Sequence, residues 1–155
     1  MLQRIQTIFL FMAMLAGLSL LIDPMTLASV EGDVDVLKSQ PQSMLEDGIF
    51  HVTDHLILLL LVGLTSFLAL VDIFQFRNRQ RQVALARGVL IGFILILLLA
   101  AVFFYQDYSQ LNQGPYLFEI GFGGLAPLAG IISTTLAIRA INKDDKLIRS
   151  MDRLR

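Results

Sequence analysis

The sequence predicts an all-α membrane protein with four antiparallel transmembrane helices and a short cytoplasmic amphipathic helical extension at the C-terminus. Three observations support this fold class. The 155-residue chain is 55% hydrophobic and only 16% charged, whereas soluble domains carry about 25% charged residues. Its apolar residues gather in long runs, and its positive charges gather beside the ends of those runs. We therefore expect a single transmembrane domain over residues 1–155.

The first predicted span covers about residues 5–22. The 18 residues between Arg4 and Asp23 carry no charge, and at about 1.5 Å per residue they reach roughly 27 Å, close to the thickness of a hydrocarbon core. The alternative is a signal peptide cleaved near the small residues of Thr26-Leu27-Ala28. The apolar core of a signal peptide is usually about 7–15 residues long, so the length favours a span.

Three further apolar segments predict spans over about residues 52–76, 83–106 and 117–141. The acidic segment 23–50 is expected to form a solvated extracytoplasmic loop. In the tail, residues 142–155, Leu147, Met151 and Leu154 recur at helical spacing and predict a helix with an apolar stripe.

The basic segment 77–87 sets the predicted orientation. It carries four arginines and no acid, and Lys and Arg near the ends of spans resist translocation. With this loop in the cytoplasm, both termini are cytoplasmic, and 11 of the 12 Lys and Arg lie on that side, all except Lys38. Seven of these residues are expected to contact lipid headgroups or a cytoplasmic partner: Arg77, Arg79, Arg81, Lys143, Lys146, Arg149 and Arg153.

Small residues recur along the third and fourth predicted spans. In lipid, helices attract each other mainly through close packing, which small side chains allow. The sequence therefore predicts helix packing within the bundle, or contact with a partner or a second copy, through Ala84, Gly88, Gly92, Gly123, Ala126, Gly130 and Ala137. Gly121, Gly123 and Gly124, together with Pro127, also predict a kink or partial unwinding of the fourth span.

Two charged residues enter the predicted spans from the cytoplasmic side. Asp72 lies about one turn before the end of the second span, and Arg87 lies at a similar depth in the third. An unpaired charge costs about 2–3 kcal/mol near the bilayer centre and less near its surface. The two interpretations are an ion pair between Asp72 and Arg87, and snorkelling of each side chain to the interface.

His51, Asp54 and His55 form the one cluster with the chemistry of metal ligands. Positions i, i+3 and i+4 share a helical face, so these side chains could meet one zinc or copper ion. Haem is a second option, although two histidines one turn apart cannot ligate opposite faces of one macrocycle. The competing interpretation is a polar first turn at the membrane surface, with Asp54 favourable at the helix start and no cofactor.

The ends of the chain and its basic loop resemble a known family. The opening Met1-Leu2-Gln3-Arg4-Ile5-Gln6-Thr7, an Arg-x-Arg-Gln segment before the third span, and the closing Asp144-Asp145-Lys146-Leu147-Ile148-Arg149-Ser150-Met151-Asp152-Arg153-Leu154-Arg155 are similar to the domain of unknown function 4293 family. The resemblance implies a small bacterial integral membrane protein with four spans, and hence the bacterial inner membrane. It implies no activity, ligand or catalytic residue.

No soluble domain and no complete catalytic set accompanies these features. The sequence contains no phosphate-cradling loop, no Ser-His-Asp set, no cysteine and no aromatic and basic nucleic-acid surface. It favours a non-enzymatic accessory or assembly subunit of a larger inner-membrane complex, in contact with lipid and with a membrane-protein partner or a second copy. The alternatives are a metal- or haem-binding redox protein built on His51 and His55, and a small transporter or channel.

Overall fold

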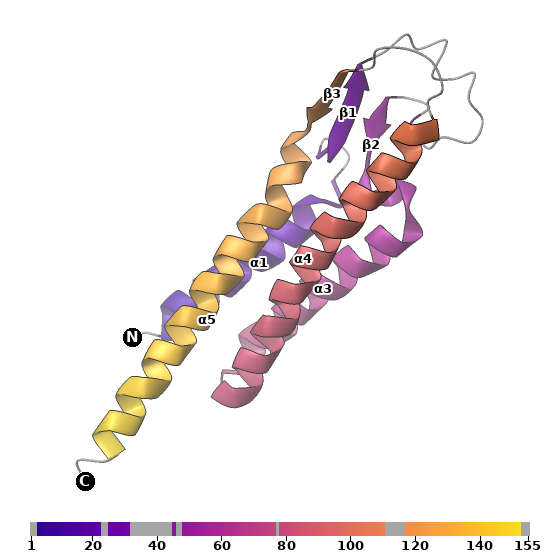
Figure 1. Ribbon diagram of the computed structural model, residues 1–155. Helices are drawn as coiled ribbons and strands as arrows, with labels where there is room; N and C mark the ends of the chain where they lie inside the picture. The colour runs from indigo at the N-terminus through magenta and orange to yellow at the C-terminus, as the bar shows by residue number, and fades with distance from the viewer. Residues whose placement is uncertain are drawn as a thin grey trace.

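The computed structural model describes residues 3–22, 25–31, 45, 48–76, 78–110 and 117–152. Within these residues the chain is mostly helical, as predicted. Four α-helices pack as a bundle in which each helix packs mainly against two neighbours, in the cyclic order α1, α3, α4, α5 (Figure 1). Their bounds are α1 Gln3–Ser19, α3 Leu56–Phe74, α4 Arg79–Gln110 and α5 Leu125–Asp152.

Among the described residues, three helices are long and apolar enough to cross a membrane, so the chain is a multi-pass membrane protein. These candidate spans are Leu56–Phe74, Arg79–Ser109 and Phe122–Leu147. The predicted first span corresponds to α1, which is shorter, with an apolar part at Ile5–Ser19.

The outer faces of the long helices suit a hydrocarbon environment. Leu60, Leu64 and Phe67 on α3 are exposed, and so are Ile91 and Leu95 on α4. A soluble bundle would carry polar residues at such outward positions. The inward faces are also apolar, so these helices are hydrophobic on all sides, as spans are.

The core of the bundle follows the helical repeat. The fully buried residues Val89, Phe93 and Ile96 on α4 face Leu58 and Val62 on α3 across one hydrophobic core. Spacings of three, four and seven residues place such side chains on one face of a helix. The sequence therefore packs α4 against α3 and α5 along this face.

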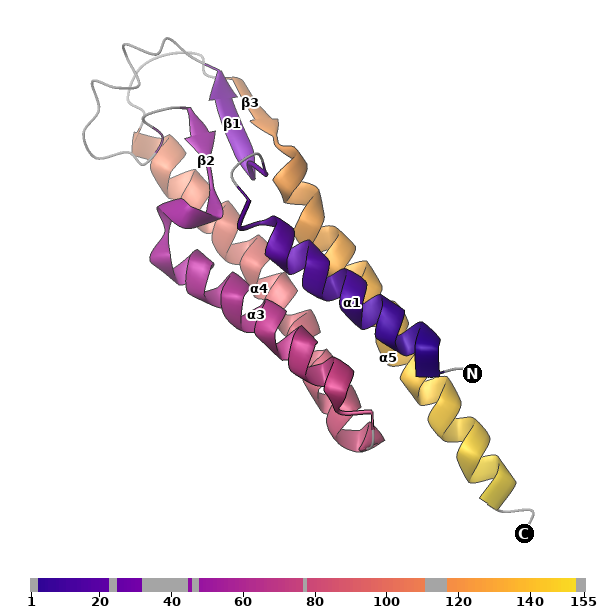
Figure 2. The ribbon, with the colours of Figure 1, turned by 180° about the vertical axis from the view of Figure 1, so that it is seen from behind.

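A small antiparallel sheet caps one end of the bundle, which we call the sheet end. It consists of β1 Ala28–Glu31, β2 Ile49–Phe50 and β3 Leu117–Ile120 in the order β2-β1-β3. The opposite end, the loop end, holds the α3–α4 connection, the start of α1 and the end of α5 (Figure 2). The all-α prediction is therefore incomplete, because segments expected as loop and span pair as strands.

The predicted fourth span begins later than expected. Residues 117–120 form β3, a 3-10 helix follows at Phe122–Gly124, and α5 begins at Leu125. Pro127 therefore lies in the first turn of α5, where no intrahelical bond is lost. The helix starts at the place where a kink was predicted, and it then continues to Asp152, so the tail is helical as far as that residue.

Candidate functional site

Part of the predicted small-residue surface packs inside the bundle. A Cβ at Gly92 of α4 would lie 2.5 Å from Thr65 Oγ1 of α3, and a Cβ at Gly130 of α5 would lie 2.5 Å from Phe93 Cε1. Ala137 of α5 is fully buried. These positions let neighbouring helices of the same chain approach each other closely, so they serve packing within the bundle.

The glycines before α5 serve the junction between sheet and helix. Gly123 N–H donates to Thr26 O at 2.9 Å, and Gly121 N–H donates to Leu27 O at 3.1 Å. A Cβ at Gly123 would lie 2.6 Å from Met25 O. The start of α5 therefore lies directly against the backbone before β1, which requires glycine. Ala126, the second residue of α5, packs against the hydrophobic core of the bundle.

Ala84 and Gly88 lie on a different surface of α4. Ala84 is exposed and Gly88 is half-buried, and a Cβ at Gly88 would meet nothing within 4 Å. Both residues share a helical face with the exposed Ile91 and Leu95. Within the described part of the chain, this face is not packed against another helix at Gly88.

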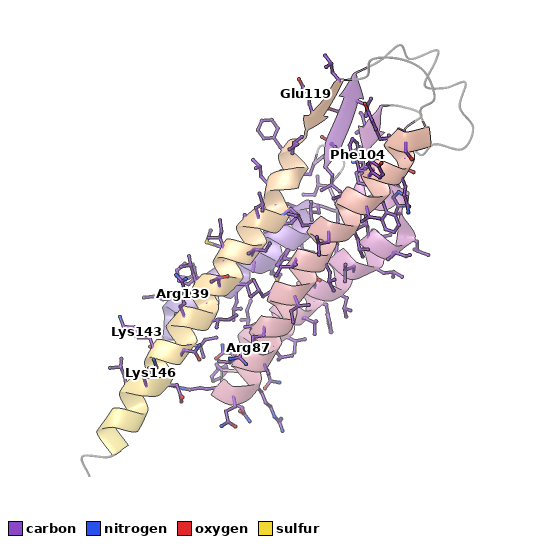
Figure 3. The ribbon with its side chains drawn as sticks, viewed as in Figure 1. Arg87, Phe104, Glu119, Arg139, Lys143 and Lys146 are labelled. Carbon is purple, nitrogen blue, oxygen red and sulfur yellow. The ribbon has the colours of Figure 1, made fainter. Side chains whose placement is uncertain are left out.

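The predicted ion pair between Asp72 and Arg87 does not form. Asp72 is fully buried, and neither of its carboxylate oxygens has a hydrogen-bond partner among the described residues. The contact of Gly92 with Thr65 places Asp72, seven residues after Thr65, roughly level with Leu85, seven residues before Gly92 on the antiparallel α4. Arg87 follows the buried Ala86 by about 100° around the helix and is exposed (Figure 3).

The three predicted metal ligands do not meet. Asp54 Oδ2 accepts a hydrogen bond from the backbone N–H of His51 at 2.6 Å, at the start of the 3-10 helix Val52–Asp54. His55 Nε2 instead lies 2.9 Å from Asp107 Oδ2 of α4. In the described ranges there is no group of three His, Cys, Asp or Glu that could hold a metal ion. The structure gives the proposed zinc or copper site no support.

His55 and Asp107 join the beginning of α3 to the end of α4. Asp107 is buried, and the His55 ring stacks on Phe103 with centroids 4.3 Å apart and an interplanar angle of 11°. Phe50 of β2 contacts both His55, at 5.7 Å, and Phe104, at 5.6 Å between centroids. This pair was not predicted, although antiparallel spans place the start of one helix beside the end of the next.

A polar contact also joins α1 to α5 near the loop end. The amide of Gln6 donates to the carboxylate of Asp144, and both residues are buried. Sequence reasoning did not select either residue, because each lies beside charged residues at the end of an apolar run. Their burial becomes visible only when α1 and α5 are placed side by side.

Those of the predicted cationic residues that the structure describes lie at the loop end. Arg81 of α4 is exposed, and so are Lys143 and Lys146 of α5, which follow Arg139 down the helix in Figure 3. Arg79 is half-buried. Arg77 and Arg153 lie outside the described residues, as does the side chain of Arg149.

Comparison with known families agrees with the resemblance found in the sequence. The family described as domain of unknown function (DUF4293) matches residues 2–154. No curated protein and no solved structure matches the chain.

Proposed function

The chain belongs to the DUF4293 family, and we propose that it is a non-enzymatic accessory or assembly subunit that binds another protein of the bacterial inner membrane. In this proposal, the outer face of α4 around Gly88 is the contact surface. The observation that supports it is the open space at Gly88, in a helix whose other interior glycine is closely packed.

Gly88 has no packing role that would justify a glycine. Glycine in a helix interior costs about 1 kcal/mol relative to alanine. At Gly92 this cost allows the close approach of Thr65, whereas Gly88 gains no such contact with the described residues. A partner helix lying across Ala84 and Gly88 would gain the close approach that small residues permit.

A second open glycine provides a matched comparison. Gly63 of α3 is exposed, and a Cβ there would also meet nothing within 4 Å. Its neighbours one turn away, Leu59 and Phe67, are large, so another helix cannot approach as closely. The surface around Gly88 is therefore the better candidate for helix docking.

Gly88→Leu is expected to abolish partner binding without unfolding the protein. The chain, tagged within residues 32–44, is solubilised gently from native membranes, and proteins recovered in stoichiometric amounts are identified. We expect the wild type and Gly63→Leu to retain a partner that Gly88→Leu loses, because the leucine fills the docking surface. Recovery of only a lone homo-oligomer, unchanged in Gly88→Leu, would contradict the proposal.

We also propose that the sheet end is extracytoplasmic and that both termini are cytoplasmic. The concentration of Lys and Arg at the loop end supports this orientation. Because the chain has no cysteine, single thiols can report on it. A membrane-impermeant maleimide added to intact spheroplasts should label Ser39→Cys, whereas Ser150→Cys should react only after the membrane is opened. The reverse pattern would show the opposite orientation.

Asp72 favours a second candidate function, a small transporter or channel. Ionisable residues inside spans often mark ion or proton pathways, and Asp72 is fully buried without a hydrogen-bond partner among the described residues. Ser66 of the same helix also has a buried hydroxyl that lacks such a partner. Proton and cation flux into liposomes containing the purified protein would test this candidate, with Asp72→Asn as the comparison.

A further inference from the structure

A cleft with both polar and apolar lining lies at the loop end, between the first turns of α4 and the second half of α5. Its volume is about 220 Å³, and it is lined by Arg79, Gln80, Val83, Ile141, Asn142 and Asp145. Figure 1 shows α5 running past the start of α4 at this end. The cleft therefore opens where the chain leaves the apolar part of the bundle.

Arg79 has hydrogen-bonding capacity that the described protein atoms do not use. Its Nη1 atom is buried and has no hydrogen-bond partner among the described residues. A guanidinium keeps its charge and carries five N–H donors, and a buried donor without a partner is costly. Because Arg79 also lines the cleft, a ligand with acceptor oxygens bound there would give the buried Nη1 a hydrogen-bond partner.

The surroundings of Arg79 favour an anion. Arg79 is the first residue of the 32-residue α4, so the positive end of the helix dipole lies at the cleft. Gln80 and Asn142 contribute side-chain amides that can donate hydrogen bonds. Lys143, next to Asn142, is exposed and adds to the positive field.

Two acids lie near the cleft, and both have an interaction within the protein. The carboxylate of Asp144 accepts a hydrogen bond from Gln6 of α1. Asp145 lines the cleft but has an interaction of its own. The guanidinium of Arg79 is therefore the group in the lining whose buried nitrogen remains for a ligand.

We propose that this cleft binds one phosphate group, with Arg79 as the principal cation and Gln80 and Asn142 as amide donors. Arg recognises phosphate through parallel N–H donors. The side-chain amides of Gln80 and Asn142 can donate further hydrogen bonds to the remaining phosphate oxygens. The phosphate can belong to an anionic phospholipid headgroup or to a free phosphate ion. The apolar part of α4 begins near Val83, so the cleft lies at the depth of the headgroups.

Arg79→Gln is expected to weaken the site about tenfold, the loss typical of a charge-assisted hydrogen bond. The full chain is purified in neutral detergent. Native mass spectrometry then measures binding of phosphatidylglycerol, with zwitterionic phosphatidylethanolamine as the comparison lipid, and thermal unfolding measures stabilisation by inorganic phosphate. Arg81→Gln removes an exposed charge from the same turn and is expected to change affinity by no more than about twofold.

The two probes separate the sources of the phosphate. Selective binding of phosphatidylglycerol without stabilisation by inorganic phosphate supports a lipid headgroup, whereas stabilisation by both supports a general phosphate site. Asn142→Leu, an exposed position on the opposite wall, should weaken binding if Arg79→Gln fails to fold. Equal losses in Arg79→Gln and Arg81→Gln, or no saturable binding of either probe, would overturn the proposal.

Discussion

Gly130→Ala is expected to destabilise the bundle by about 1–3 kcal/mol, whereas Gly88→Ala is expected to stabilise it by up to about 1 kcal/mol. The added Cβ at position 130 would lie 2.5 Å from Phe93 Cε1 and 2.6 Å from Phe93 Cζ. Phe93 is fully buried, and its ring also lies against Gly17 of α1, 3.7 Å from the Cβ position there. The ring therefore cannot move aside without disturbing a third helix.

Position 88 lacks this constraint because nothing lies within 4 Å of its Cβ site. There, alanine only reduces the backbone freedom that glycine loses on folding. Unfolding of the purified variants in detergent micelles with rising SDS content, followed by circular dichroism, gives both changes in free energy. Gly63→Ala is a second open position and should behave like Gly88→Ala. Changes of the same sign at positions 130 and 88 would contradict the described packing.

Hydropathy located the helices but not all of their ends. The third predicted span, 83–106, corresponds to α4, which runs from Arg79 to Gln110. Polar segments such as Arg79–Gln82 continue the helix beyond the apolar run, where hydropathy gives no signal. The fourth predicted span, 117–141, included residues 117–120, which form β3. A short and mostly apolar segment of this kind fits a transmembrane helix as well as a strand.

The sheet could not be derived from local patterns. β1, β2 and β3 contain four, two and four residues, and Ala28 pairs with both Phe50 and Ile120 from distant parts of the chain. Strand preference depends strongly on such neighbours. The glycines before α5 are the sequence signal that could have indicated this contact. A glycine-rich segment at the start of a helix is compatible with a kink, but also with close approach of another backbone, as Gly121 and Gly123 approach residues 25–27.

The chemistry of single residues did not identify the partners that they have in the structure. His55 was expected to share a metal ion with His51 and Asp54, whereas in the structure its ring lies 2.9 Å from the carboxylate of Asp107, 52 residues away. Asp72 and Arg87 were expected at similar depths, yet the rotation of α4 leaves Arg87 exposed while Asp72 is buried. Depth follows from sequence position, whereas helix rotation follows from packing contacts such as that between Gly92 and Thr65.

Asp72→Leu is expected to raise the free energy of unfolding by about 1–3 kcal/mol, the cost typical of a buried polar group without a partner. Leucine has the same number of side-chain heavy atoms and the same branching as aspartate, so it fills the space without the two oxygens. Those oxygens have no hydrogen-bond partner among the described residues. Unfolding in SDS micelles measures the change.

Asp144→Leu provides the matched control, with the opposite expected sign. Asp144 is also buried, at 6% exposure, but it accepts a hydrogen bond from Gln6 of α1. Its replacement leaves the Gln6 amide buried without that acceptor and should cost about 1–3 kcal/mol. If both variants lose stability, Asp72 has a stabilising partner in the folded protein. If Asp72→Leu gains stability but loses partner binding or ion flux, the carboxylate is kept for function at the expense of stability.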